Sequence, residues 1–455
     1  MGENLLGLVL DARRAKKEGE AAIARRQRDR LGAMVAFARD NSPFYQKLYA
    51  KLPADAPLEQ LPVTNKKALM SAFDDWLTDR SVRFAETQAF ADDPGTVGEP
   101  FRGYTLATTS GTSGTKGIFL FDRTAMAVTQ AVAFRMLTSW LGFGDFLRII
   151  AGSGRMAMVR AKGGHFASAV AAAGLQRRRR KGSMLVLSVH DPVPELVDRL
   201  NEFEPALMAP YASIAALLAT EQEQGRLHIK PVLLALSAEG LAVEEYGRIA
   251  KAFNAKVGNS YASTEVPFLS FSCDRGWLHV NTDWVTCEAV DADYKPVAKG
   301  EVSHTVLVSN LANRLQPVLR YDLGDSIIER PDRCPCGSPF PAIRVQGRAS
   351  DLVHFEAPGG AVTMPPMAFY MLLDPIPGVD LYQVVQTGPA ALRVRLRISA
   401  DEARVWQEVE SGMRALLERH GLGHVKIERG SEPPEQTAGG KFRNVIPLKS
   451  EGPKP

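Results

Sequence analysis

The sequence predicts a mixed α/β protein with a large N-terminal part and a small C-terminal part. Between residues 146 and 258, short apolar segments alternate with helical segments, which is typical of mostly parallel sheets covered by helices. Residues 284–290 and 302–309 are rich in Val, Thr and Trp and indicate a β-rich subdomain. Residues 381–428 combine strand-like and helical segments, so they predict a small α+β unit at the C-terminal end.

The individual elements follow from hydrophobic periodicity and from helix start and stop signals. Residues 8–38 lack proline and predict one long amphipathic helix. The other expected helices are 124–140, 192–202, 213–224, 243–253 and 401–422. The expected strands are 146–150, 184–188, 206–209, 232–236, 256–258, 284–290, 302–309, 381–386, 392–398 and 425–428. Ligands bind at the carboxyl ends of parallel strands, so the segments that follow residues 236 and 258 are expected at the site.

Composition argues against several classes of protein. The chain has 455 residues, of which 45% are hydrophobic and 23% are charged, as in ordinary globular proteins. The net charge of +4 suits an anionic small molecule but is too small to indicate nucleic acid as a partner. The sequence shows neither a signal-peptide pattern nor an apolar run of membrane-spanning length, so we expect a cytoplasmic protein with no membrane partner. Four cysteines do not indicate a disulfide framework in a chain of this length.

A loop rich in hydroxyl groups and glycine carries the strongest functional signal. Residues 108–117 read Thr-Thr-Ser-Gly-Thr-Ser-Gly-Thr-Lys-Gly. Glycines let backbone N–H groups approach a ligand, while hydroxyls and the ammonium of Lys116 suit phosphate oxygens. The Walker A spacing is absent, so we do not expect the nucleotide to be used as in a kinase or GTPase. A flexible linker is the alternative, but strand-like segments on both sides favour a phosphate loop.

Four further motifs could complete a nucleotide site. Residues 261–265 (Tyr-Ala-Ser-Thr-Glu) present a carboxylate suited to Mg²⁺, and residues 320–325 (Arg-Tyr-Asp-Leu-Gly-Asp) offer one that can accept both hydroxyls of a ribose. Residues 347–351 (Gly-Arg-Ala-Ser-Asp) lie at a change in composition. Residues 439–443 (Gly-Gly-Lys-Phe-Arg) place a lysine on a flexible glycine pair. Taken singly, such motifs could also be a helix cap, a hairpin turn or a surface turn.

In this order and spacing, the motifs resemble those of adenylate-forming enzymes of the acyl-CoA synthetase superfamily, most closely the phenylacetate–CoA ligase branch. Residues 41–45 (Asn-Ser-Pro-Phe-Tyr) and 333–337 (Arg-Cys-Pro-Cys-Gly) also match that branch. The resemblance covers nearly the whole chain. It implies an N-terminal domain of residues 1–346 that binds ATP and the acid, and a mobile C-terminal domain of residues 347–455 joined to it by a hinge.

Matched residue by residue, the resemblance implies a complete nucleotide site. Glu265 would hold Mg²⁺, Asp325 would bind the ribose hydroxyls, and Arg348 would support the ribose from the hinge side. Lys441 would be the mobile catalytic lysine, acting with Glu265 and with Thr112 of the phosphate loop. The other implied nucleotide-binding residues are Thr109, Ser110, Gly111, Ser113 and Gly114 in the phosphate loop, Ser237, Ala238 and Glu239 at the adenine, and Tyr261, Ala262, Ser263 and Thr264 beside the base.

The implied activity is activation of a carboxylic acid by ATP, with release of pyrophosphate and formation of an acyl-adenylate. Transfer of the acyl group to CoA would follow, with an aromatic acid as the leading substrate class. Transfer to an amine or to the thiol of a carrier protein is the alternative that the sequence leaves open. The chain departs from the branch at Ser350, where the hinge usually has Asp, and at Thr115–Gly117, where a Lys-Pro pair is more usual. The resemblance also suggests a homodimer.

Three cysteines and one histidine form a candidate metal site. Cys273-x5-His279 and Cys334-x-Cys336 make two pairs of soft ligands, and together they match a closed Cys₃His zinc site of the structural kind. The phenylacetate–CoA ligase branch has cysteines and a histidine in corresponding places. The alternative is that these residues are ordinary buried thiols. Cys287 is left over and is expected in the core.

Two other signals suggest different functions. Residues 152–157 fit the pattern G-x-G-x-x-A and, with the basic run 177–181, could mimic an NADP site of a reductase, although a single match is weak. We expect the basic run to be a solvated face; otherwise it could meet the 3′-phosphate of CoA or an acidic carrier protein. A non-catalytic nucleotide- and zinc-binding relative is the remaining class, which the presence of Lys441, Asp325 and Glu265 disfavours. The sequence does not identify the acid.

Overall fold

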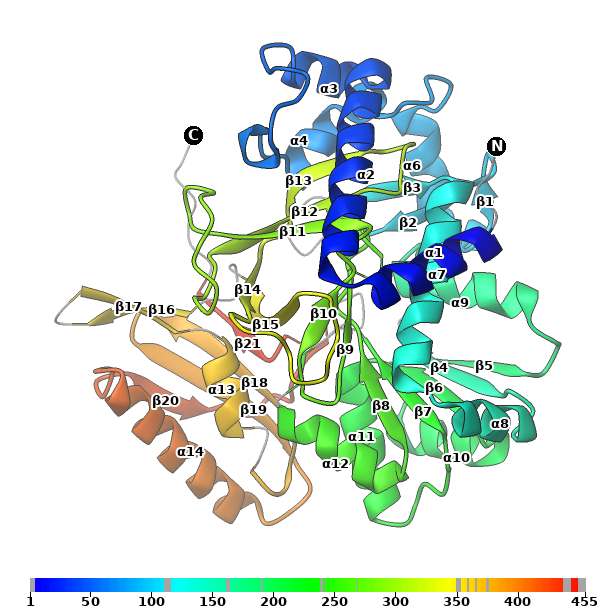
Figure 1. Cartoon of the computed structure of the whole chain (residues 1–455). Coiled ribbons are helices and arrows are strands. Elements are labelled where there is room, and N and C mark those ends of the chain that lie inside the picture. The colour runs from blue at the N-terminus through cyan, green and yellow to red at the C-terminus, as the bar shows by residue number, and fades with distance from the viewer. Residues whose placement is uncertain are drawn as a thin grey trace.

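The computed structural model describes residues 5–109, 116–160, 164–189, 191–237, 240–241, 243–267, 269–348, 353–357, 360–364, 366–373, 376–436 and 443–448. Figure 1 shows three groups of elements. The N-terminal helices and two small antiparallel sheets lie at the top, a parallel sheet with its helices lies at the lower right, and the C-terminal elements lie at the lower left. No described helix is both long enough and apolar enough to cross a lipid bilayer.

The N-terminal region is helical, but the expected single helix over 8–38 is wrong. Two helices, α1 (Leu5–Glu18) and α2 (Glu20–Asn41), meet at Gly19, whose φ of 86° requires the left-handed conformation that glycine adopts without strain. Ser42 then caps α3 (Pro43–Leu48) by accepting a hydrogen bond from the backbone of Tyr45. The next elements are α4 (Lys66–Ser71), α5 (Phe73–Trp76), α6 (Phe84–Asp92), β1 (Pro100–Phe101), β2 (Tyr104–Thr108), β3 (Ile118–Phe121) and α7 (Arg123–Trp140).

A five-stranded sheet carries the predicted alternation of strands and helices. Its order is β5-β4-β6-β7-β8, and every neighbouring pair is parallel. The strands are β4 (Met156–Arg160), β5 (Met184–Ser188), β6 (Leu207–Pro210), β7 (Leu233–Leu236) and β8 (Lys256–Asn259). The helices are α9 (Ala167–Arg178), α10 (Val193–Phe203), α11 (Ala212–Glu223) and α12 (Val243–Phe253). Figure 1 shows that these helices accompany the sheet, as the sequence pattern predicts.

The strand expected at 146–150 is wrong, because these residues belong to helix α8 (Phe143–Ala151). A short apolar run does not distinguish a strand from a helix by periodicity alone. Asp145 favours the helix, because its carboxylate accepts a hydrogen bond of 2.8 Å from the backbone N–H of Gly142 and caps the helix. Residues 152–157 therefore follow a helix rather than a strand. A dinucleotide-binding turn must follow a strand, so the basis for an NADP-dependent reductase is lost.

The β-rich region forms two antiparallel sheets, one of which contacts β8 of the parallel sheet through β9. One has the order β14-β15-β10-β9 and the other β11-β12-β13. Their strands are β9 (Ser270–Ser272), β10 (Leu278–Val280), β11 (Val285–Val290), β12 (Thr305–Asn310), β13 (Val318–Asp322), β14 (Asp325–Glu329) and β15 (Ala342–Arg348). The predicted α/β class with parallel and β-rich sheets is confirmed.

The C-terminal elements form the predicted α+β unit around their own buried cluster, which includes Phe355, Phe369 and Val409. Its main sheet has the order β20-β19-β18-β21. The elements are β16 (Val353–Ala357), β17 (Gly360–Met364), α13 (Pro366–Leu373), β18 (Val379–Gly388), β19 (Ala391–Ile398), α14 (Glu402–Arg419), β20 (Lys426–Arg429) and β21 (Val445–Ile446). The division into domains at 346/347 stays a prediction, and this position falls within β15.

Candidate functional site

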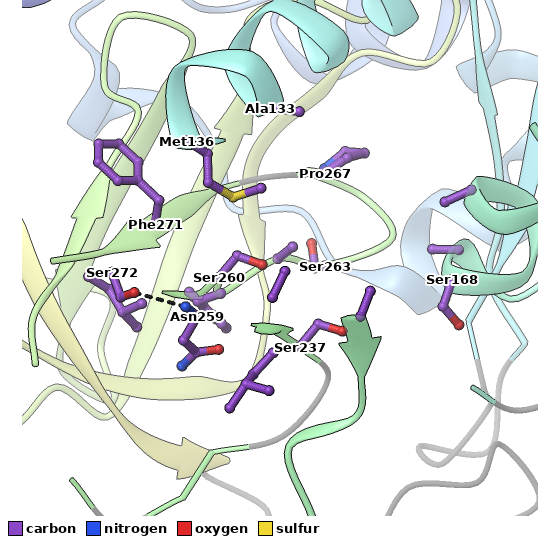
Figure 2. Close-up of a pocket in the computed structure, with 18 of the residues that line it drawn as sticks. Ala133, Met136, Ser168, Ser237, Asn259, Ser260, Ser263, Pro267, Phe271 and Ser272 are labelled. Atoms are coloured by element: carbon purple, nitrogen blue, oxygen red, sulfur yellow. Dashed lines mark hydrogen bonds between the residues drawn. The ribbon is translucent and has the colours of Figure 1, made fainter. Parts of the chain in front are cut away.

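A cleft of about 2700 Å³ runs along β6, β7 and β8 to their carboxyl ends. Figure 2 shows Met136 of α7 and Phe271 of β9 on one side of this pocket and Ser168 of α9 on the other. Ser237 and Ser260, which follow β7 and β8, lie between them. The prediction that the segments after residues 236 and 258 reach a common site is therefore confirmed.

The hydroxyl-rich loop starts from a closed hairpin. The backbone N–H of Thr109 donates to the carbonyl of Gly117 at 2.9 Å, and the N–H of Gly117 donates to Oγ1 of Thr109 at 2.8 Å. The backbone N–H of Thr108 donates to the carbonyl of His165 at 2.7 Å, which ties the hairpin to the segment before α9. Thr109 lines the cleft. These bonds therefore hold Thr109 and Gly117 together, with Thr109 at the cleft.

Glu265 lies buried at the cleft, with an exposed fraction of 5%. The hydroxyl of Tyr321 donates to its Oε1 at 2.9 Å, and the side-chain amide of Asn310 donates to its backbone carbonyl at 3.1 Å. Burial and the neighbouring carboxylate of Glu265 raise the pKa of Tyr321, so the hydroxyl keeps its proton. No described residue donates to Oε2 of Glu265, so this oxygen is available to a ligand. A carboxylate with one oriented and one available oxygen fits the Mg²⁺ role.

Asp325 and Asp322 belong to one motif but have different surroundings. Asp322 is engaged within the turn, since Oδ1 accepts hydrogen bonds from Thr305 at 2.6 Å and from the N–H of Gly324 at 2.9 Å. Asp325 accepts a hydrogen bond of 2.6 Å from the hydroxyl of Tyr261. This bond joins two motifs that are 64 positions apart in the sequence. Arg348 lies opposite Asp325 in the β14–β15 pair, so the backbone places the two residues expected at the ribose next to each other.

Asn259 begins the segment that follows residue 258, which the sequence places at the site without giving Asn259 a role, and it lines the cleft. Its backbone N–H donates to Oγ of Ser272 at 2.8 Å, a bond drawn in Figure 2, and its side-chain amide donates to the hydroxyl of Tyr246 at 2.9 Å. Its Oδ1 is buried and has no partner in the described part of the chain. A buried acceptor without a partner is costly, which points to a donor on a bound ligand.

The candidate metal ligands come together as predicted. The ligand atoms of Cys273, His279, Cys334 and Cys336 all lie within 4.8 Å of one another. Nδ1 of His279 donates to the carbonyl of Phe340 at 2.8 Å, which leaves Nε2, 3.1 Å from Sγ of Cys336, for a metal. Burial, with a contribution from the neighbouring Cys334 and Cys273, raises the pKa of Cys336 to about 12. Three sulfurs and one oriented imidazole nitrogen fit a structural zinc site. The presence of zinc stays a prediction.

Two known proteins resemble this chain, one in sequence and one in fold. Over 465 aligned residues, the chain is 25% identical to a phenylacetate–coenzyme A ligase of Thermus thermophilus, covering 93% of this chain and 96% of the relative. The fold matches a 2-hydroxyisobutyryl-CoA ligase in the postadenylation state with a TM-score of 0.65 and 20% identity, over 94% of this chain and 90% of that one. The predicted resemblance to the adenylate-forming superfamily is confirmed. No protein-family model matches the chain.

The same ligase fold has been solved in another state. Against the 2-hydroxyisobutyryl-CoA ligase in its thioesterification state, the TM-score is 0.52 at 21% identity, over 94% of this chain and 89% of that one. This comparison, like the first, shows a shared fold.

Several predicted site residues lie outside the described residues. They are Ser110, Gly111, Thr112, Ser113, Gly114, Ala238, Glu239 and Lys441. Arg443 and Asn444, which follow Lys441 by two and three positions, line the cleft. Of the described residues, the cleft brings together Thr109, Ser237, Tyr261, Ala262, Ser263, Thr264, Glu265 and Asp325. The individual roles of these residues stay predictions.

Proposed function

We propose that this protein activates a carboxylic acid with ATP and transfers the acyl group to CoA. The observation that carries the proposal is the convergence of Thr109, Glu265 and Asp325, from three distant motifs, on one cleft. The 25% identity to a phenylacetate–CoA ligase over nearly the full length of both chains supports the same activity. The substrates would be ATP, a small carboxylic acid and CoA, with Mg²⁺ bound during the first step.

In the first step, a carboxylate oxygen of the acid attacks the α-phosphorus of ATP, and the bond to the β-phosphate oxygen breaks to release pyrophosphate. Asp325, held by Tyr261, would accept the ribose hydroxyls, and Oδ1 of Asn259 would accept a hydrogen bond from the amino group of adenine. Mg²⁺ bound to Glu265 would supply positive charge beside the phosphates. Both reactants are anionic, so fixed positions and neutralised charge provide most of the acceleration.

In the second step, the thiolate of CoA attacks the acyl carbon, and AMP leaves. Lys441 would act in the first step only and would leave the site when the C-terminal domain, residues 347–455, rotates. Arg443 and Asn444 at the cleft support an approach of the lysine segment from the same side.

An aromatic acid is the substrate class that we favour. Trp140, Phe271 and Met136 line the cleft beside Ser260 and Ser263, so planar apolar surface and hydroxyl groups face the same space. Flat rings pack well against aromatic side chains, and a methionine beside them adapts to the edge of a ligand ring.

The test is acid-dependent exchange of labelled pyrophosphate into ATP. The panel would contain phenylacetate, benzoates, hydroxy- and aminobenzoates and short fatty acids, with Lys441→Ala as the control. Exchange with at least one acid, abolished in Lys441→Ala, is the expected result. Adding CoA should then give AMP and a thioester in equal amounts. Adenylate formation without thioester would favour an amine or a carrier thiol as acceptor, and no exchange with any acid would contradict the proposal.

A further inference from the structure

The candidate metal site and the cleft share one short strand. β9 has three residues, Ser270–Ser272, and its neighbour β10 also has three. Phe271 and Ser272 line the cleft, and Cys273 directly after them is one of the four candidate ligands. His279, another ligand, pairs with Phe271 across the two strands. Two strands of this length have few hydrogen bonds of their own, so whatever holds Cys273 and His279 together also holds the cleft wall.

Ser272 connects this strand to two other elements of the cleft. Its Oγ accepts a hydrogen bond of 2.8 Å from the backbone N–H of Asn259, at the end of β8. Its carbonyl accepts a hydrogen bond of 2.8 Å from the indole Nε1–H of Trp140, at the end of α7. The Trp140 ring lies so close to Gly258 that any side chain there would collide with it. Movement of β9 would therefore shift Asn259 and Trp140 together.

The far side of the metal cluster is also tied to the cleft wall. Nδ1 of His279 donates to the carbonyl of Phe340, and the Phe340 ring packs edge-on against Phe271 with centroids 6.2 Å apart. Phe271 and Phe340 share a buried cluster with Met136, which lines the cleft. Arg135, the neighbour of Met136 on α7, places its guanidinium 4.7 Å from the centre of the Phe340 ring. Contacts on both sides of the metal cluster therefore reach residues that line the cleft.

We propose that a metal ion bound by Cys273, His279, Cys334 and Cys336 sets the nucleotide- and acid-binding shape of the cleft, with Ser272 as the positioning residue that transmits it. The inference rests on the proposed function, because it assumes that ATP and an acid occupy the cleft. Residues outside the ligand set commonly tune or transmit the effect of a metal site. In this protein the effect passes from the metal site to the cleft.

The first test removes the Ser272 hydroxyl and leaves the metal ligands in place. In Ser272→Ala, Cys273 and the other ligands are intact, so the variant should keep about one equivalent of zinc, measured by elemental analysis. The N–H of Asn259 loses its acceptor, so ATP binding in the presence of Mg²⁺, measured by calorimetry, should weaken about five- to tenfold. Ser272→Thr keeps the hydroxyl and should restore most of the affinity. Unchanged affinity in Ser272→Ala would overturn the inference.

The second test removes the metal. Cys273→Ala should lose the zinc and weaken ATP binding at least as much as Ser272→Ala does, while Cys287→Ala, which alters the one cysteine outside the cluster, should change neither. Combining Cys273→Ala with Ser272→Ala should add little, because both act through one link. Normal ATP affinity in metal-free Cys273→Ala, or wild-type protein that takes up no added Zn²⁺, would overturn the inference and leave the proposed function standing. Wild-type protein that binds no ATP would overturn both.

Discussion

Two buried carboxylates, Glu265 and Asp283, lie in the same half of the molecule but have opposite surroundings. Asp283 is fully buried, and Arg135 donates to both of its oxygens at 2.8 and 2.5 Å. Asn281 completes this group by accepting from the same guanidinium at 3.0 Å. Glu265 is also buried, yet its side chain has only the hydroxyl of Tyr321 and no cation among the described residues.

The difference separates a structural carboxylate from a functional one. Burial of a charge is unfavourable unless an opposite charge compensates it. The protein itself supplies that charge at Asp283, where α7 is joined to the segment before β11. At Glu265 the described chain supplies orientation but no charge, so a cation from outside the chain is the natural partner. Three predictions test this contrast, and a fourth extends it to a carboxylate near the surface.

The largest expected effect is on stability at Asp283. Asp283→Ala leaves the Arg135 guanidinium buried, with an exposed side-chain fraction of 3%, and without its carboxylate. The free energy of unfolding should fall by about 3–5 kcal/mol, measured by urea denaturation. Replacing Arg135 by Met in the same protein should recover part of the loss. A loss below about 1 kcal/mol would show that the pair does not stabilise the fold.

Glu265→Gln should have the opposite pattern, with a small effect on stability and a large effect on activity. The amide keeps an oxygen for the Tyr321 hydroxyl, so the unfolding midpoint should stay close to that of the wild type. The negative charge is lost, so the rate of ATP–pyrophosphate exchange should fall about a hundredfold to a thousandfold, as for the removal of other key electrostatic groups. A large loss of stability with a normal exchange rate per folded molecule would reverse the assignment of Glu265 and Asp283.

Tyr321→Phe should have a smaller effect of the same kind. The ring stays buried while the hydroxyl that orients Glu265 is removed. The Mg²⁺ concentration for half-maximal exchange should rise about fivefold, and the free energy of unfolding should fall by about 1 kcal/mol. A Mg²⁺ titration at saturating ATP measures the first effect. An unchanged Mg²⁺ requirement would mean that the Tyr321 hydroxyl stabilises the fold without positioning Glu265.

The smallest effect concerns Asp79, a carboxylate near the surface. Hydrogen bonds from the side chain and backbone of Ser81 and from the hydroxyl of Tyr104 hold the pKa of Asp79 below its usual value near 3.8. Its contribution to stability is therefore present above that pH and is lost as the pH falls through the lower folded-state pKa. Asp79→Asn should unfold with a slightly weaker dependence on pH below about 4 than the wild type. If both proteins unfold identically as the pH falls, Asp79 does not contribute to the pH dependence of stability.

Much of the fold could be predicted because its signals are local. The helix expected at 243–253 matches α12 (Val243–Phe253), and the strand expected at 184–188 matches β5 (Met184–Ser188). The errors also have local causes. Gly19 breaks a pattern that reads as one helix, and the apolar run at 146–150 has no periodicity that favours a helix over a strand.

The candidate site was predictable in its residue types and less so in its contacts. Glu265, Asp325 and the three clustered cysteines belong to motifs whose chemistry is visible in the sequence. The support of Glu265 by Tyr321, 56 positions away, depends on how β13 packs against the segment that follows β8, and no local pattern encodes it. The sequence places Asn259 at the site but gives it no role, because the lack of a partner for its buried Oδ1 among the described residues is a property of the folded cleft.

The central claim is that a carboxylate oxygen of the acid attacks the α-phosphorus of ATP. The most direct measurement follows a heavy oxygen isotope placed in the carboxylate of an accepted acid during a complete turnover with ATP, Mg²⁺ and CoA. The account predicts that one labelled oxygen appears in the phosphate of AMP, because cleavage of the acyl-adenylate leaves that oxygen on phosphorus. Label in inorganic phosphate, or AMP released without label, would contradict it.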